Sequence, residues 1–149
     1  MVTKVAAILL GILLLLPSKH LVEDSPTFPE SEWDRQVQCL YSAVYHEAKG
    51  EPSIGKKAVM EVVLNRAKNR KQSICDVVKS PHQFSWYSPK ISLKVNVNVL
   101  TEYNTVARMG TVVEDSTEYF HSVGKPSWAR GMRLVRVVGN HKFYSTKEN

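Results

Sequence analysis

The hydrophobic pattern changes its period once along this chain, and that change limits the fold more than any other feature of the sequence. Up to about residue 109 the apolar residues recur at intervals of three and four, which is typical of amphipathic helices. Beyond Gly110, short segments rich in β-branched and aromatic residues alternate with glycines, which is typical of strands. The order predicts an α+β fold that is mainly α, with a small antiparallel sheet in the C-terminal third.

The first expected helix has the strongest signals at its ends. Ser31 and Asp34 form a capping-box pattern at its start, and Gly50 is a natural stop. The second helix is apolar around much of its circumference, so we expect it to be central and largely buried. The expected helices are 31–50, 54–68, 73–78 and 97–109, with an ordered loop at 80–90, and the expected strands are 117–123, 133–138 and 141–145.

The N-terminus carries a segment unlike a globular core. Lys4 precedes an uninterrupted apolar run from Val5 to Leu16, which Pro17 ends. The run has the length of a signal-peptide core and is short for a helix that spans the ~30 Å hydrocarbon layer. No clean cleavage site follows it, so residues 1–19 are either a cleaved signal peptide or an uncleaved signal-anchor.

The rest of the chain is long enough for one domain. A polar linker is expected at 20–30 and the folded domain at 31–149. The domain is expected to work outside the cytoplasm, in the periplasm or cell wall, or tethered to the membrane by the signal segment. A formal net charge of +6 suits an anionic partner, such as nucleic acid, a membrane surface or a cell wall rich in carboxylate and phosphate. Export argues against nucleic acid.

The cysteines leave two alternatives open. Cys39 and Cys75 fit a single disulfide in an oxidising compartment, and they fit two buried free thiols equally well. No CxxC pair occurs, so structural zinc is not expected. An HExxH zinc site also fails, because Gly50 stands where the second histidine would be. We expect no metal and no other cofactor.

Glu47 is the first candidate for catalysis. Helical spacing places it beside Leu40 and Val44, at the border of the apolar face. Partial burial raises the pKa of a carboxyl and lets it hold a proton near neutral pH, as general-acid cleavage of a glycosidic bond requires. On position alone, an ordinary solvent-exposed glutamate at a helix end remains the alternative.

Two further charged residues are expected to be structural. Arg66 falls among the apolar positions of the second helix, where a lone guanidinium is costly. A buried arginine is normally paired, and Glu51 or Asp76 are the available partners. We therefore expect Glu51 and Arg66 to stabilise the fold rather than to take part in chemistry.

Read together, several spaced segments resemble the cell wall hydrolase family that includes the spore-cortex-lytic enzymes of germinating bacilli. They follow one another in the family's order. The segments are CLYSAVYHEAKGEP (39–52), GKKAVMEVVLNRAKN (55–69), ICDVVKSPHQFSW (74–86), STEYFHSVGKPSWAR (116–130) and GNHKFYS (139–145). The resemblance implies a lysozyme-like domain related to lytic transglycosylases and resuscitation-promoting factors.

The resemblance also implies site residues and a reaction. The glutamate of the HEA(K/R)GE motif is the family's catalytic acid and base, and here it is Glu47. The usual reaction cuts the β-1,4 bond between N-acetylmuramic acid and N-acetylglucosamine in peptidoglycan without water, and leaves a 1,6-anhydro end. Aromatic and polar residues of the loop and the C-terminal third are then expected to bind the glycan: Gln83, Phe84, Ser85, Trp86, Tyr119, His121 and Trp128.

Other readings stay open beside this one. A lysozyme-type hydrolase would need a second carboxylate to position water, with Glu51 and Asp115 as candidates. A non-catalytic wall-binding protein of the same fold is the second alternative, and a basic nucleic-acid-binding module is the third. A minimal exported domain, expected to be monomeric, suits a phage endolysin or a small bacterial wall-remodelling enzyme.

Overall fold

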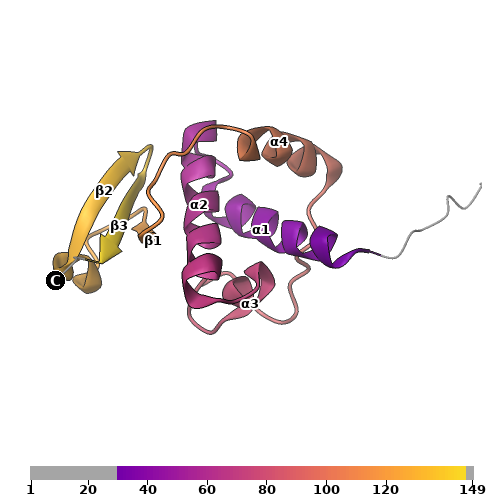
Figure 1. Ribbon diagram of the computed structural model, residues 1–149, viewed down its shortest axis with the longest axis horizontal. Coiled ribbons are helices and arrows are strands. Elements are labelled where there is room, and N and C mark those ends of the chain that lie inside the picture. Colours follow the sequence, from indigo (N-terminus) through magenta and orange to yellow (C-terminus); the bar gives the residue numbers. More distant parts are fainter. Residues whose placement is uncertain (1–29, 147–149) are drawn as a thin grey trace, which may run out of the picture.

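A computed structural model of the chain describes residues 30–146, so the expected signal segment at 1–19 and nearly all of the expected linker lie outside the described residues. The described part begins with four helices and ends with a three-stranded sheet (Figure 1). The elements are α1 (Glu32–Ala48), α2 (Ser53–Arg70), α3 (Ile74–Lys79), α4 (Val97–Ala107), β1 (Thr117–His121), η1 (Ser127–Gly131), β2 (Met132–Val138) and β3 (His141–Thr146). The predicted α+β order is confirmed.

The second helix, α2, is the centre of the fold. It contacts α1, α3 and α4 as well as β1 and β2, and in Figure 1 it stands between the sheet and the other helices. Two of its buried polar residues are paired with each other, since Lys57 and Glu61 lie 3.7 Å apart, and Glu61 also accepts the backbone N–H groups of Val112 and Val113. The predicted central position of this helix is confirmed.

The helix ends follow their capping residues. Ser31 and Asp34 form the predicted capping box of α1. The second helix extends beyond its predicted range at both ends, since Pro52 fixes the start and Lys71, in a left-handed conformation, closes the end. The fourth helix stops before Gly110, because Arg108 and Met109 donate to carbonyls three residues back and tighten the last turn.

A disulfide joins the first and third helices. Cys39 of α1 and Cys75 of α3 are bonded, with their Cα atoms 5.2 Å apart. The sequence left this bond and two free thiols equally open, and the structure has the bond. The link closes a loop across α2, so it restricts the unfolded chain as well as the folded one.

The sheet is antiparallel in the order β1-β3-β2, which places the last strand in the middle. Phe143 and Ser145 of β3 are fully buried. Register shifts interrupt both pairings, between Thr117 and Tyr119 in β1 and between Leu134 and Arg136 in β2. The strand predictions hold to within two residues, and the largest difference is at the end of β1, which stops at His121.

The sheet is fastened to the helices by a buried carboxylate. Glu51, in the corner between α1 and α2, accepts hydrogen bonds from the backbone N–H and the side-chain amide of Asn140, at 3.1 and 3.0 Å. His141 Nδ1 lies 3.7 Å from the same carboxylate. Gly139, which directly precedes Asn140, has a left-handed φ of 56°. The contact fixes the β2–β3 turn against the helical part.

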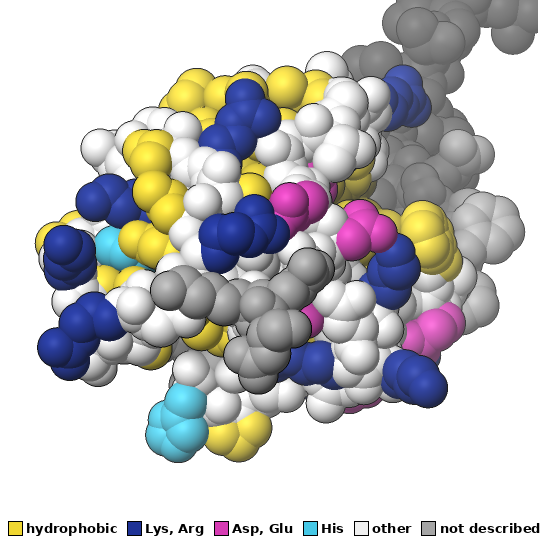
Figure 2. Space-filling model, turned by 60° about the vertical axis from the view of Figure 1, so that its left-hand side comes forward, with side chains coloured by type: hydrophobic (Ala, Val, Ile, Leu, Met, Phe, Trp, Pro, Cys, Tyr) yellow, Lys and Arg dark blue, Asp and Glu magenta, His cyan; other side chains and the backbone are white. Residues whose placement is uncertain are grey.

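One face of the molecule shows how its positive charge is distributed. On the face shown in Figure 2, Lys and Arg side chains are spread over the molecule rather than gathered into one stripe. A nucleic-acid footprint is typically a clustered basic patch, so this face does not favour one. Within residues 30–146 no helix combines the length and the apolar character needed to cross a membrane.

Substitutions at two glycines with positive φ test how much the Glu51 contact contributes to the free energy of unfolding. A Cβ at Gly139 would collide with Glu51 Oε2, whereas a Cβ at Gly124 (φ 76°) meets nothing. We expect Gly124→Ala to lower the free energy of unfolding by about 1–2 kcal/mol, the backbone cost alone. Gly139→Ala should cost at least about 2 kcal/mol more, because Glu51 loses hydrogen bonds. Chemical denaturation measures both, and equal losses would contradict this account of the turn.

Candidate active site

Glu47 lies in the last turn of α1 and is half-buried. Its Oε1 accepts a hydrogen bond of 2.9 Å from the indole N–H of Trp86. The same indole stacks on His46, with ring centroids 4.2 Å apart and planes 14° from parallel. The loop between α3 and α4 is thereby held against the end of α1, and the carboxyl is held in one orientation.

The environment of Glu47 favours the protonated form. Burial raises the pKa of Glu47 above its ordinary value, while the Trp86 hydrogen bond and the positive charge of Arg66 partly oppose that rise. His46, its neighbour, has its pKa lowered by burial and by Lys49, which favours a neutral imidazole. The predicted partial burial of Glu47 is confirmed, and the carboxyl is suited to general-acid chemistry.

Two adjoining cavities meet beside this carboxyl. The Glu47 cavity has a volume of about 360 Å³, and the Trp128 cavity, named for Trp128 on its wall, has about 430 Å³. They share four lining residues, so together they form one groove, which we call the Glu47 groove. The shared residues are Arg66, His82, Gln83 and Phe120.

Glu47 is the one carboxylate among the described residues that line either cavity. Glu51 is buried and holds Asn140 with both of its oxygens. Asp115 is exposed and pairs with Lys68 at 2.6 Å. Neither of the carboxylates considered for positioning water lines the Glu47 groove.

Most of the glycan-binding candidates from the sequence come together in the Glu47 groove. Gln83, Phe84, Ser85 and His121 line the Glu47 cavity, and Gln83, Tyr119 and Trp128 line the other. Phe84 is only 5% exposed, so it is mainly a core residue. Trp86 lines neither cavity; its link to the site is the hydrogen bond to Glu47.

Trp128 is the most accessible aromatic side chain of the Glu47 groove. It is 40% exposed and packs against Tyr119, His121 and Tyr144. His121 stacks on Tyr144 and shares a hydrogen bond of 3.0 Å with its hydroxyl. Strands β1 and β3 therefore fix the position of the indole while leaving part of its face uncovered.

The predicted ion-pair partners of Arg66 are wrong. Its Nε donates to the backbone carbonyl of Glu118 at 2.7 Å, and its guanidinium lies over the rings of Phe84 and Phe120, at 5.5 and 5.9 Å. A carbonyl and two aromatic faces therefore replace the expected carboxylate. Burial lowers the pKa of Arg66 to about 10, so it remains charged at neutral pH. Its Nη1 is buried without a hydrogen-bond partner among the described residues.

Several residues of the Glu47 groove were not predicted from the sequence as site residues, among them Arg66, His82 and Phe120, which line both cavities. His82 has a left-handed φ of 61°. The signal for Arg66 was present, because a single cation stood on an apolar helix face. No signal marked His82, since a left-handed backbone conformation in a loop is not readable from one sequence.

A metal site does not emerge from the described part of the chain. Across residues 30–146, no three or more His, Cys, Asp or Glu side chains are grouped so that they could hold an ion. The described side chains that line the groove provide one carboxyl and two guanidinium groups, together with imidazole, hydroxyl, amide and aromatic groups.

Comparison with solved structures identifies the fold. The catalytic domain of Bacillus cereus SleB matches with a TM-score of 0.64, over 83% of this chain and 99% of that domain, at 21% identity. The catalytic domain of the germination-specific lytic transglycosylase SleB from Bacillus anthracis matches with a TM-score of 0.65, over 79% of this chain and all of that domain, at 22% identity. The chain has this lysozyme-like fold, as predicted.

Sequence comparison finds a relative that matches over a short segment and a family model that matches over more than half of the chain. A spore cortex-lytic enzyme of Halalkalibacterium halodurans is 42% identical over 45 residues, which is 30% of this chain and only 14% of that protein. A family model described as Cell Wall Hydrolase matches residues 50–144, a range that begins just after Glu47 and covers more than half of the 149-residue chain. The chain therefore belongs to the cell wall hydrolase family.

Proposed function

We propose that this protein cleaves the glycan strands of bacterial peptidoglycan, with Glu47 as its catalytic acid and base. One observation carries the proposal: among the described residues, a half-buried carboxyl with a raised pKa is the one acid of a groove lined by aromatic and amide side chains. A raised pKa increases the share of the carboxyl that carries a proton and can give it to a leaving oxygen. Membership of the cell wall hydrolase family supports the same substrate class.

The proposed reaction cuts the β-1,4 bond between N-acetylmuramic acid and N-acetylglucosamine. Glu47 gives its proton to the glycosidic oxygen as the bond from that oxygen to the muramyl C1 breaks. The C6 hydroxyl of the same sugar then attacks C1 and gives its proton to the Glu47 carboxylate, which regenerates the acid. The products are a free 4-hydroxyl and a 1,6-anhydromuramyl end, and no water is consumed.

Hydrolysis is the alternative reaction at the same bond. An inverting or retaining hydrolase uses a second carboxylate, either to activate water or as a nucleophile. Both carboxylates considered for that role, Glu51 and Asp115, are engaged with other residues and do not line the Glu47 groove. Their positions favour the ring-closing reaction.

The two cavities fit a sugar polymer that crosses in front of Glu47. Trp128 and Tyr119 offer aromatic faces on which sugar rings stack, and Ser85 offers a hydroxyl for the ring substituents. Gln83 lines both cavities, and its carbonyl already accepts a bond of 2.9 Å from Arg70. We assign these residues to binding, and assign Trp86 to orienting Glu47.

The disulfide supports a location outside the cytoplasm, as does the proposed substrate. A Cys39–Cys75 bond persists in oxidising surroundings, which are those outside the cytoplasm. Peptidoglycan lies in the same compartment. We propose that residues 1–19 direct export and that residues 31–149 form the catalytic domain.

Replacing Glu47 by Gln tests the reaction. Gln keeps the volume but cannot deliver or recover a proton, so cleavage should fall by at least about 10²–10⁴-fold with little change in stability. Glu102→Gln on α4, away from the Glu47 groove, is the matched control and should remain active. Wild-type products should be lighter by one water, about 18 Da, than hydrolysis products. Activity in a folded Glu47→Gln protein would refute the proposal, and reducing muramyl ends would select hydrolysis.

Replacing Trp86 by Phe tests whether the indole N–H lowers the pKa of Glu47. Phe keeps a ring beside His46 but removes the N–H that stabilises the carboxylate. The pKa of Glu47 should rise further, so the alkaline side of the pH–rate profile should move to higher pH. Carbon NMR titration of the Glu47 carboxyl gives the same quantity without turnover. Trp33→Phe, at an exposed site on α1, should change neither, and an unmoved profile in Trp86→Phe would contradict the assigned role.

Replacing Trp128 by Ala tests the Glu47 groove. Loss of the aromatic face should weaken binding to long glycan strands by roughly three- to tenfold. Trp33→Ala removes a more exposed indole, 72% against 40%, from α1 and should leave binding unchanged. Co-sedimentation with purified peptidoglycan measures both variants, and equal losses would show that the Glu47 groove is not the binding surface.

A further inference from the structure

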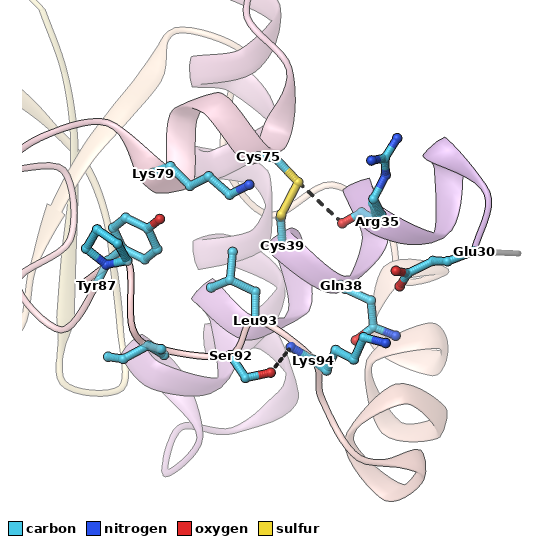
Figure 3. A pocket seen from close by; sticks show the side chains of 12 residues that line it. Glu30, Arg35, Gln38, Cys39, Cys75, Lys79, Tyr87, Ser92, Leu93 and Lys94 are labelled. Carbon is cyan, nitrogen blue, oxygen red and sulfur yellow. Dashed lines mark hydrogen bonds between the residues drawn. A yellow bond between two sulfur atoms is a disulfide. The ribbon is translucent and has the colours of Figure 1, made fainter.

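A third cavity is lined in part by residues within 87–94, in the segment between α3 and α4 that also carries Trp86. It has a volume of about 410 Å³, and its floor includes the Cys39–Cys75 disulfide (Figure 3). Tyr87 and Leu93 line one side, and Lys79 of α3 extends toward the disulfide. We call this the disulfide cavity.

A smaller cavity connects the disulfide cavity with the end of α1. It has a volume of about 140 Å³ and is lined by Tyr45 and His46. Ser92 and Lys94 line both cavities, so the two are continuous along α1. His46 directly precedes Glu47 and stacks on the indole that binds it. The two cavities, which we call the side groove, thus run from the disulfide to the neighbour of the catalytic carboxyl.

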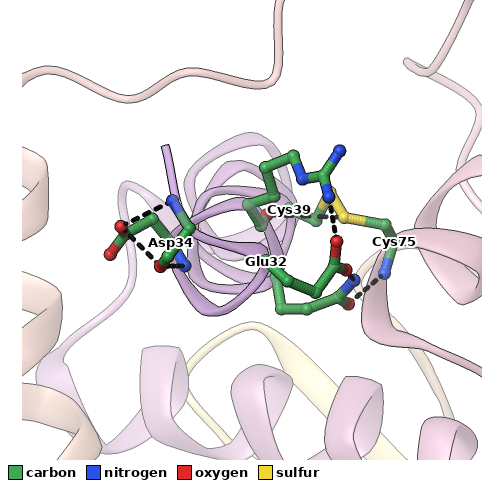
Figure 4. Close-up of polar contacts among 7 residues, drawn as sticks. Glu32, Asp34, Cys39 and Cys75 are labelled. Carbon is green, nitrogen blue, oxygen red and sulfur yellow. Dashed lines mark hydrogen bonds and ion pairs between the residues drawn. A yellow bond between two sulfur atoms is a disulfide. The ribbon is translucent and has the colours of Figure 1, made fainter. Parts of the chain in front are cut away.

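The walls of the side groove are fixed in place by three links. The disulfide ties α1 to α3 (Figure 4). Gln36 Oε1 accepts the backbone N–H of Cys75 at 3.0 Å, which is a second link between the same helices. Gln38 Oε1 accepts the backbone N–H of Val95 at 2.8 Å and holds the segment before α4 against α1. A groove held in this way is organised before a ligand arrives, which lowers the cost of binding.

The charge of the side groove is positive. Lys79 and Lys94 are exposed on its walls, and neither forms an ion pair with a carboxylate within residues 30–146. Arg35 also lines it and is paired with Glu32. Glu30 is the one acid among the lining residues that the structure describes. The side groove therefore suits a ligand with carboxylates and small apolar side chains.

We propose that the side groove binds the short acidic peptide attached to the muramyl residue that is cleaved; this rests on the proposed function. Such a peptide begins at the lactyl group of the sugar in front of Glu47. From His46 back to Cys39, α1 rises about 10 Å, at ~1.5 Å per residue. Four extended residues span about 13 Å, at ~3.3 Å each. The free carboxylates of the peptide come within reach of Lys94 and Lys79, and its apolar side chains reach Leu93 and Tyr87.

Binding measurements with two matched ligands test the side groove. One ligand is a set of soluble glycan fragments with their peptides, and the other is the same set after an amidase has removed the peptides. The full chain carrying Glu47→Gln prevents turnover during calorimetry. The parent should bind the peptide-bearing fragments more tightly. Adding K79Q and K94Q removes two exposed ion pairs with the peptide, so it should weaken that binding by roughly three- to tenfold. The affinity for the stripped fragments should not change.

A charge-matched control separates the side groove from general attraction. K71Q with K90Q removes the same charge from exposed sites that line neither cavity, and affinity should not change. Equal affinity of the parent for both ligands overturns the proposal. A loss of affinity in the K79Q/K94Q variant that is equal for both ligands also overturns the proposal. An equal loss in the K71Q/K90Q control does the same. If the wild-type protein cleaves glycan strands with no preference for those that carry peptides, only the proposal for the side groove is refuted. If the protein prefers peptide-bearing fragments but does not cleave them, only the proposed reaction is refuted.

Discussion

The Glu47 groove has walls from two parts of the fold, and the buried carboxylate of Glu51 holds those parts together. Glu47 comes from the helical part, whereas Phe120 and His121 come from the sheet. Glu51 binds the turn at Asn140 from the corner that follows the helix carrying Glu47. Because only three residues lie between the two glutamates, the contact that positions the sheet also fixes the chain next to Glu47. Asn65 adds a second fastening, through the carbonyls of Glu114 and Thr117 at 2.9 and 3.0 Å.

Arg66 shows how a buried cation can be retained without an ion pair. A carboxylate beside it would neutralise the guanidinium and would also bring a second negative charge to the Glu47 groove. Two aromatic faces and one carbonyl stabilise the cation instead. Its charge then acts on Glu47 and moderates the rise in the pKa of that carboxyl that burial causes. Stability and proton affinity are thus coupled through one side chain of α2.

The fold could be predicted from the sequence further than the site could. Helix and strand ranges depend on local patterns, such as the capping box at Ser31 and the apolar circumference of the second helix, and these held. The predicted carboxylate partner of Arg66 was wrong, because the burial of an arginine indicates that it has a partner but not which kind. A backbone carbonyl from a distant strand cannot be identified from the local sequence. The place of Glu47 at the border of a helix face left an ordinary helix-end glutamate open, and the resemblance of its HEA(K/R)GE motif to the cell wall hydrolase family singled it out. His82 was missed because nothing in one sequence marks a left-handed residue in a loop.

The hydrogen bond from Trp86 to Glu47 has a practical consequence for following the enzyme in solution. An indole N–H that faces a carboxylate experiences a different local field from one that faces a neutral carboxyl. Indole emission is sensitive to such fields, so the intrinsic fluorescence of Trp86 should change as Glu47 gains or loses its proton. With Trp33 and Trp128 replaced by Phe, Trp86 would be the single tryptophan of the chain and would report the ionisation of Glu47 without an added label.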